Sequence, residues 1–252
     1  MTSKTITATS VQDHPLPKNV FTGLRDPGLL AKWPIIGITL FIFGSLVFGA
    51  MVLNLYAHGP LLAWDRIIAN TLPAIGLKSP PFVKIIMDAG FYIGDQVVVA
   101  LEILLCIYFI FKRYWQELIT VAIGAAGSSL VFLLISNFVA RQRPPTQIWI
   151  VLTIPGFPSG HAIGVIVFYG LMAYWLVPKV RTTFLKGVVI VAALFIMVFV
   201  GFSRIFTAGH YLTDVLAGYA IGIAYFGAVY TLIEIYFQKR RNRKELEKVS
   251  LR

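Results

Sequence analysis

Six long apolar runs, each able to cross a lipid bilayer as a helix, constrain this chain more than any other feature of its sequence. The hydrocarbon core of a bilayer is about 30 Å thick, so a spanning helix needs roughly 20 mostly apolar residues. With 58% hydrophobic and only 13% charged residues, the chain is predicted to be an all-α, polytopic membrane protein with six transmembrane helices in one bundle. The expected spans are 34–55, 89–111, 118–139, 162–177, 184–202 and 215–237.

The Lys and Arg residues in the short connections predict how the bundle is oriented, because cytoplasmic loops carry an excess of them. If the N-terminus is cytoplasmic, sixteen of the 22 basic residues fall on that side. Both termini are therefore expected in the cytoplasm, in a multi-pass protein of the plasma membrane. The net charge of +11 is then explained by topology and by membrane lipids as partners, without nucleic acid.

The chain divides into one membrane domain between two polar tails. Residues 1–32 are polar, contain three prolines and show no cleavable signal peptide, so we expect a cytosolic N-terminal tail. Residues 33–237 are expected to form the six-helix membrane domain, and residues 238–252 a basic cytosolic C-terminal tail. Cys106 is the only cysteine, which excludes an internal disulfide and metal sites built on several thiolates. The sequence does not predict an oligomeric state.

An amphipathic stretch, GPLLAWDRIIANTLPAIG (59–76), separates the first two spans. Such a stretch is typical of a helix lying in the membrane interface. We expect it at the outer face, as a structural cap over the bundle rather than as a substrate gate.

Three polar segments lie on the outer side of the predicted topology. They are ARQRPP (140–145), GFPSGHA (156–162) and SRIFTAGHYLTD (203–214). Charged residues beside a membrane are costly, so a concentration of them indicates a function. Together these segments supply Arg141, Arg143, Ser159, His161, Arg204, His210 and Asp214.

The residue types in these segments suit a phosphate dianion. Arginine forms paired hydrogen bonds with phosphate oxygens. Ser159 and Gly160 stand where the fourth span begins, so Ser159 is expected to cap that helix while its free amides face an anion.

The two histidines suit phosphoryl transfer. His210 and Asp214 are four residues apart, so on a helix they would share a face, and the carboxylate could hold one imidazole nitrogen while the other attacks phosphorus. His161 comes from another helix and could protonate the departing oxygen. A metal site of His161, His210 and Asp214 is the alternative, but the arginines would repel a cation.

At these positions the sequence resembles the type 2 phosphatidic acid phosphatase family. That family's signature has three parts: Lys, six residues, Arg-Pro; Pro-Ser-Gly-His; and Ser-Arg, five residues, His, three residues, Asp. The second part is complete at 158–161 and the third at 203–214. The first part retains Arg143 and Pro144 but has Ser136 in place of the lysine. The resemblance is close over the third to sixth spans.

The resemblance implies a membrane lipid phosphatase at the outer leaflet that forms a phosphohistidine without metal or cofactor. In it, His210 would be the nucleophile, Asp214 its orienting partner, and His161 the acid and then the base. The residues implied to hold the phosphoryl oxygens are Arg143, Arg204, Ser159 and Gly160, with Arg141 as a candidate replacement for the lysine.

The sequence leaves the substrate and part of the reaction open. Phosphatidic acid, phosphatidylglycerol phosphate and undecaprenyl diphosphate are all candidate substrates. A lipid phosphotransferase using the same phosphohistidine is an alternative, as is a non-enzymatic protein that binds or transports lipid phosphates.

Further polar and aromatic residues have two interpretations each. Asp88, Asp95 and Glu102 recur every seven residues, either as a proton or ion path or as a polar stripe packed on serines of the third span; we favour the stripe. Trp149 and Phe157 flank the site, either to contact a lipid chain or as simple anchors.

Overall fold

The computed structural model describes residues 34–145 and 154–250. All regular secondary structure in these two ranges is helical, which confirms the predicted all-α fold. The elements are α2 (Pro34–Tyr56), α3 (Leu61–Lys78), α4 (Pro81–Gly94), α5 (Gln96–Phe111), α6 (Trp115–Val139), α7 (Gly160–Leu176), a 3-10 turn (Val177–Lys179), α8 (Thr183–Phe206) and α9 (Leu212–Ser250).

Within the described residues, six helical segments are long and apolar enough to cross a membrane, which agrees with the predicted number of spans. The second span differs from the prediction, because it begins at Pro81 and is broken at Asp95 into α4 and α5. Proline suits the first turn of a helix, where its missing N–H costs nothing. The backbone of Asp95, with φ −131° and ψ −83°, is not helical, so the α4–α5 break places this carboxylate at a bend.

The last span also runs beyond its predicted end. Helix α9 continues without a break to Ser250, so most of the expected C-terminal tail is a continuation of the membrane helix. The expected N-terminal tail lies outside the described residues.

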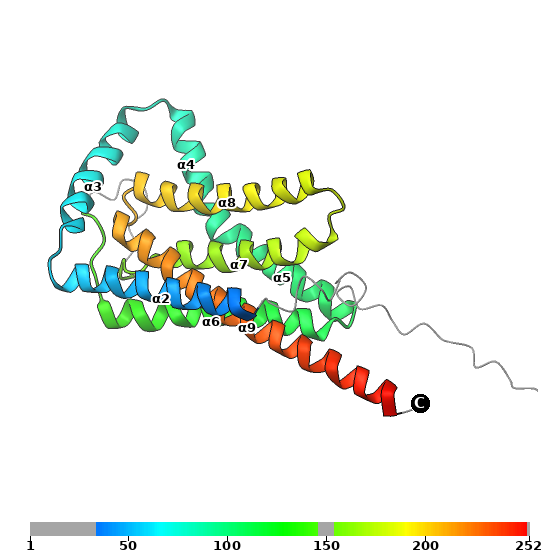
Figure 1. Ribbon diagram of the computed structural model, residues 1–252. Coiled ribbons are helices and arrows are strands. Elements are labelled where there is room, and N and C mark those ends of the chain that lie inside the picture. Colours follow the sequence, from blue (N-terminus) through cyan, green and yellow to red (C-terminus); the bar gives the residue numbers. More distant parts are fainter. Residues whose placement is uncertain (1–33, 146–153, 251–252) are drawn as a thin grey trace, which may run out of the picture.

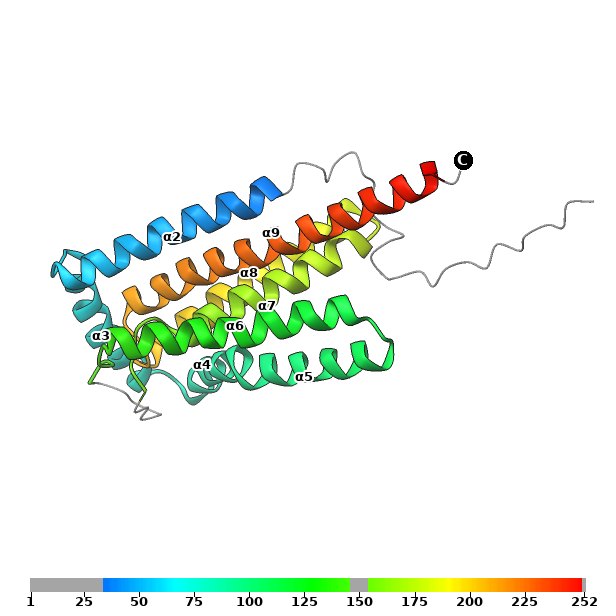
Figure 2. The ribbon, with the colours of Figure 1, turned by 90° about the horizontal axis from the view of Figure 1, so that it is seen from below.

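The helices run side by side, with α3 across one end of the bundle and the C-terminal part of α9 projecting from the other (Figures 1 and 2). Helix α7 packs against α6, α8 and α9, and α2 packs along α9. Small residues allow the close contact between α2 and α9: a Cβ added to Gly44 would lie 2.5 Å from the carbonyl oxygen of Ala220. Small residues at such contacts are typical of membrane helices.

Helix α3 confirms the predicted amphipathic stretch. Its buried face consists of Asp65, Ala69, Pro73 and Gly76, whose spacing follows the helical repeat. Trp64 and Ile67 are exposed. A helix with this pattern is suited to lie in the membrane interface over the end of the bundle.

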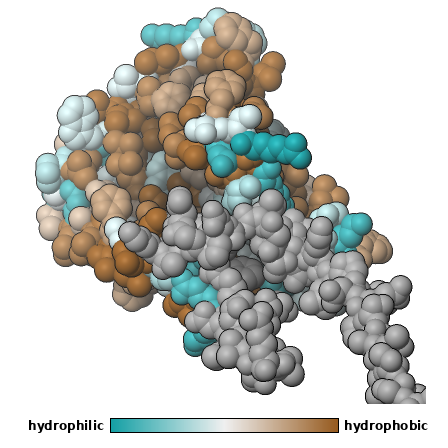
Figure 3. Space-filling model, turned by 45° about the vertical axis from the view of Figure 1, so that its right-hand side comes forward, coloured by the Kyte–Doolittle hydropathy of each residue, from teal (hydrophilic) through white to brown (hydrophobic). Residues whose placement is uncertain are grey.

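Apolar side chains cover most of the coloured surface in Figure 3. Leu46, Leu134 and Phe195 are each at least 64% exposed. An outward apolar surface of this extent is unfavourable in water and favourable in lipid, which agrees with a multi-pass membrane protein.

Candidate active site

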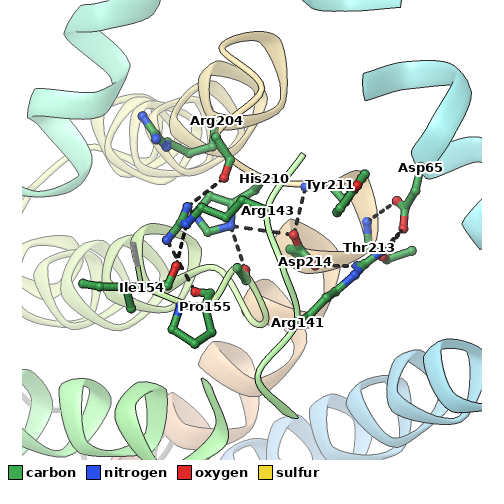
Figure 4. A network of polar contacts seen from close by, with 12 residues as sticks. Asp65, Arg141, Arg143, Ile154, Pro155, Arg204, His210, Tyr211, Thr213 and Asp214 are labelled. Carbon is green, nitrogen blue, oxygen red and sulfur yellow. Dashed lines mark hydrogen bonds and ion pairs between the residues drawn. The ribbon is translucent and has the colours of Figure 1, made fainter. Parts of the chain in front are cut away.

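The three polar segments meet at the end of the bundle that α3 covers (Figure 4). The chain reaches this end after α6, before α7 and between α8 and α9. Arg143 Nη1 lies 3.0 Å from His210 Nε2, and the rings of His161 and His210 are 6.5 Å apart between centroids. The structure therefore brings together one residue from each predicted motif.

The sequence predicted His210 in the first turn of the last span. In the structure His210 lies before the first residue of α9. The connection from Thr207 to Tyr211 is not helical, and Ala208 has a positive φ of 53°. His210 and Asp214 consequently do not share a helical face. The Nδ1 atom of His210 lies 2.8 Å from the Gly156 carbonyl oxygen, whereas the nearer Asp214 oxygen is 3.8 Å away.

These contacts define the tautomer of His210. A carbonyl oxygen only accepts hydrogen bonds, so Nδ1 carries the proton and donates it to Gly156. The Nε2 atom then has a free lone pair, which accepts a hydrogen bond from Arg143. Burial lowers the pKa of His210 well below 6.5, and the positive charges of Arg143 and Arg204 lower it further. His210 is therefore a neutral imidazole near pH 7.

Arg143 is held by backbone carbonyls instead of carboxylates. Its guanidinium donates to Ile154 O at 2.8 Å and Gly209 O at 2.7 Å. Neutral acceptors orient the guanidinium without neutralising its charge. The positive charge is thus available to an anion beside His210 Nε2.

Arg204 is a second buried guanidinium at the site, with 2% of its surface exposed. It lies over the ring of Phe91 at 4.7 Å, and its Nε has no hydrogen-bond partner among the described residues. Gly209 makes room for it, because an added Cβ there would overlap a guanidinium nitrogen. A buried donor without a partner is costly, so this one is suited to receive an oxygen of a ligand.

The start of α7 supplies further groups without partners. Ser159 precedes the helix but does not cap it through its side chain, which differs from the prediction. Ser159 Oγ and His161 Nε2 are both buried and have no hydrogen-bond partner in the described part of the chain. Gly160 and His161 line the same cavity as His210.

Arg141 occupies a different place from the one predicted for a phosphate ligand. Its guanidinium donates to Asp214 Oδ1 and, at 2.8 Å, to Asp65 Oδ2. Two carboxylates neutralise this guanidinium, so it does not replace the missing lysine in the cradle. Ser136, at the lysine position, is buried and bonds to Leu133 O within α6.

A cavity of about 300 Å³ extends from the two histidines between α5 and α6. Its polar lining away from the histidines comprises Asp95, Glu102, Ser128 and Ser129. The acidic residues and the serines of α6, which were predicted to pack together, thus line the same cavity. Neither Asp95 nor Glu102 forms a side-chain hydrogen bond or a close ion pair with any described residue. Of the aromatic residues expected near a lipid chain, Phe157 is fully buried and Trp149 lies outside the described residues.

The sequence analysis missed Asp65. This residue is 1% exposed on the inner face of α3 and contacts both Arg141 and Thr213. An acidic residue on a helical face that is otherwise apolar, with Leu61, Leu62, Ile68 and Ala69 three or four positions away, was the signal that could have identified it. No group of three or more His, Cys, Asp or Glu side chains among the described residues is arranged to hold a metal ion.

Comparisons with known proteins identify sequences and a structure that this chain resembles. Residues 117–237 match the family model of the PAP2 superfamily. Phosphatidylglycerophosphatase B of Bacillus subtilis (strain 168) is 30% identical over 121 residues, which are 47% of this chain and 58% of that protein's length.

The fold also matches a solved structure. The crystal structure of the first transmembrane PAP2 type phosphatidylglycerolphosphate phosphatase from Bacillus subtilis superposes with a TM-score of 0.63. It shares 24% identity and covers 82% of this chain and 97% of its own. All three motifs lie within residues 117–237, the region that matches the PAP2 superfamily model.

Proposed function

We propose that the protein is a membrane lipid phosphate phosphatase that works through a phosphohistidine at His210. The observation that carries this proposal is the state of His210, whose Nδ1 proton is held by Gly156 O and whose Nε2 lone pair lies 3.0 Å from Arg143. A neutral imidazole with a free lone pair, beside a guanidinium that no carboxylate neutralises, suits attack on a phosphate.

In the first step, His210 Nε2 attacks phosphorus and the P–O bond to the lipid alcohol breaks. His161 donates a proton to the departing oxygen. Arg143 exchanges its contact with Nε2 for the phosphoryl oxygens. Arg204, Ser159 Oγ and the Gly160 amide provide the remaining donors.

In the second step, His161 accepts a proton from water, whose oxygen attacks phosphorus. The N–P bond breaks, phosphate leaves and His210 Nε2 regains its lone pair. Asp214 is 3.8 Å from His210 Nδ1 and stabilises the positive charge that develops on the imidazole. None of these steps needs a metal ion.

The lining of the cavity favours a lipid phosphate monoester over a diphosphate. Beyond the arginines and histidines, the ionisable groups that line it are acidic, Asp95 and Glu102, and the carboxylate of Asp95 would repel a second phosphate. The same acidic groups and two serines can instead bond to the hydroxyls of a glycerol headgroup. Phosphatidylglycerol phosphate, the substrate named for both relatives, meets these conditions.

We place the reaction at the outer leaflet of the plasma membrane, with both termini in the cytoplasm. The support is the distribution of Lys and Arg in the sequence. The site and the C-terminal end of α9 lie at opposite ends of the bundle (Figure 1).

The test is phosphate release by the purified protein in detergent, with EDTA present. The panel contains phosphatidylglycerol phosphate, phosphatidic acid and undecaprenyl diphosphate, each assayed with and without an alcohol acceptor. We expect release from the monophosphates that EDTA does not abolish. Transfer to the acceptor with little free phosphate would instead identify a phosphotransferase, and no reaction in folded protein would contradict the proposal.

Neutralising a carboxylate of the cavity should weaken the preference for a phosphate monoester over a diphosphate. In Asp95→Asn we expect kcat/KM for the diphosphate to rise about tenfold relative to the monophosphate, a difference of about 1.4 kcal/mol in repulsion. Asp88→Asn is the matched control, because Asp88 lines a separate, smaller cavity. An unchanged ratio in Asp95→Asn would show that this carboxylate does not select the substrate.

The lowered pKa of His210 predicts how the unliganded protein responds to acid. A histidine whose pKa lies below 6.5 stays neutral as the pH falls through 6.5, so His210 Nε2 should remain unprotonated at pH 6. The chain has four histidines, so 15N NMR of histidine-labelled protein, with His210→Asn for assignment, can measure this. Protonation of His210 near pH 6.5 or above would contradict the expected environment.

A further inference from the structure

The buried carboxylate of Asp65 links α3 to the site. It lies on the side of Asp214 that faces away from His210. Its Oδ1 accepts from the backbone N–H of Thr213 at 2.9 Å, and its Oδ2 accepts from the Thr213 hydroxyl and from Arg141. Thr213 is the second residue of α9, so its N–H is one of the donors that a helix start leaves free. Asp65 therefore caps α9 from another helix.

Arg141 links Asp65 to the two groups near His210 Nδ1, which are the Asp214 carboxylate and the Gly156 carbonyl. Its side chain donates to Asp214, while its backbone oxygen accepts from Gly156 N at 2.7 Å. Gly156 in turn accepts the Nδ1 proton of His210 through its own carbonyl oxygen. One arginine thus fixes the hydrogen-bond acceptor of the nucleophile and the carboxylate beside it (Figure 4).

The charges in this cluster show how Asp65 helps to orient the Arg141 guanidinium. Arg141 Nη1 donates to Asp214 and Nη2 donates to Asp65, so the two carboxylates hold the guanidinium at both terminal nitrogens. The ring of Tyr211, 4.3 Å from the guanidinium carbon, bounds Arg141 on a further side. Buried charge networks of this kind are rigid when every member has its partners.

We propose that Asp65 is a positioning residue of the phosphoryl-transfer site, acting through Arg141 on the orientation of His210 and Asp214. This inference rests on the proposed phosphohistidine function. It also gives α3 a part in the reaction: the helix that covers the end of the bundle supplies one of the charges that order the nucleophile.

The test compares Asp65→Asn, Arg141→Gln and the double variant with the unchanged protein. Asp65→Asn keeps the shape of the side chain and removes its charge. Misplacing a nucleophile by about 1 Å can cost about 100-fold in rate, so we expect kcat to fall 10- to 100-fold while KM changes less than about threefold. The double variant should be no slower than Arg141→Gln alone, because both changes act through the same contact.

Competitive inhibition by inorganic phosphate, the product, separates positioning from collapse of the site. The inhibition constant should be unchanged in Asp65→Asn. Asn70→Ala, at an exposed position of the same helix, is the matched control and should leave kcat unchanged. A normal kcat in Asp65→Asn, or additive losses in the double variant, would overturn the inference. If Asp65→Asn does not fold, Asp65→Glu decides, since it keeps the charge but displaces the carboxylate; a normal kcat in that variant would also overturn the inference.

Failure of this inference is distinguishable from failure of the proposed function. If the unchanged protein is folded but releases no phosphate from any lipid, the phosphatase proposal fails. If it releases phosphate and the Asp65 variants do so equally well, only the role of Asp65 fails.

Discussion

His210→Asn is expected to lower phosphate release by at least about 10⁴-fold, because it removes the Nε2 atom that attacks phosphorus in the proposed mechanism. Asparagine can still donate a hydrogen bond to Gly156 O, so the connection before α9 should keep its conformation. The measurement is phosphate release from phosphatidylglycerol phosphate, together with quenching in alkaline detergent to detect label bound to the protein. Labelled protein that is unstable in acid and stable in base is expected for the unchanged chain and not for the variant.

His58→Asn provides a matched control for this variant. His58 lies at the same end of the bundle but lines another cavity and adopts a positive φ, a conformation that asparagine tolerates. It should retain full activity. If His210→Asn kept more than about 1% of the activity, or if His58→Asn lost as much, His210 would not be the nucleophile.

His161→Gln is expected to separate the two steps of the reaction. General acid and base catalysis contribute about 10² to 10⁴ in rate, and His161 would serve in both steps. With a lipid substrate the variant should therefore be slow throughout. With p-nitrophenyl phosphate, whose leaving group needs little protonation, the first step should proceed while the second remains slow.

The expected observation is a burst of p-nitrophenol equal to the amount of enzyme, followed by little turnover. Phosphorylated protein should accumulate with the burst, and His210→Asn/His161→Gln should show neither. Steady turnover of p-nitrophenyl phosphate by His161→Gln, without a burst, would show that His161 is not the base of the second step.

The spans were predictable from the sequence because lipid imposes a length and a polarity on every helix that crosses it. The start of the second span was not, since Lys84 and Asp88 interrupt its apolar character before the bend at Asp95. These polar groups are accommodated by the second, smaller cavity beside Arg204, which only the tertiary structure creates.

The motifs predicted which polar residues come together at this end of the bundle, but not which contacts they make. The spacing of His210 and Asp214 suggested a shared helical face, yet α9 begins two residues after His210 and the Gly156 carbonyl takes the Nδ1 proton. Arg141 resembled a phosphate ligand because of its neighbours in the sequence. Its real partner, Asp65, is 76 positions away, a separation at which sequence periodicity carries no information.

The unbroken α9 fixes the depth of the chemistry in the bilayer. A helix rises about 1.5 Å per residue, so Asp214 and Lys239 are separated by about 38 Å along its axis. The hydrocarbon core is about 30 Å thick, and about 40 to 45 Å with the headgroup layers. If Lys239 lies at the headgroups of one leaflet, Asp214 lies at the level of the phosphates of the opposite leaflet. A lipid can thus meet the nucleophile while its chains stay at their ordinary depth in the membrane.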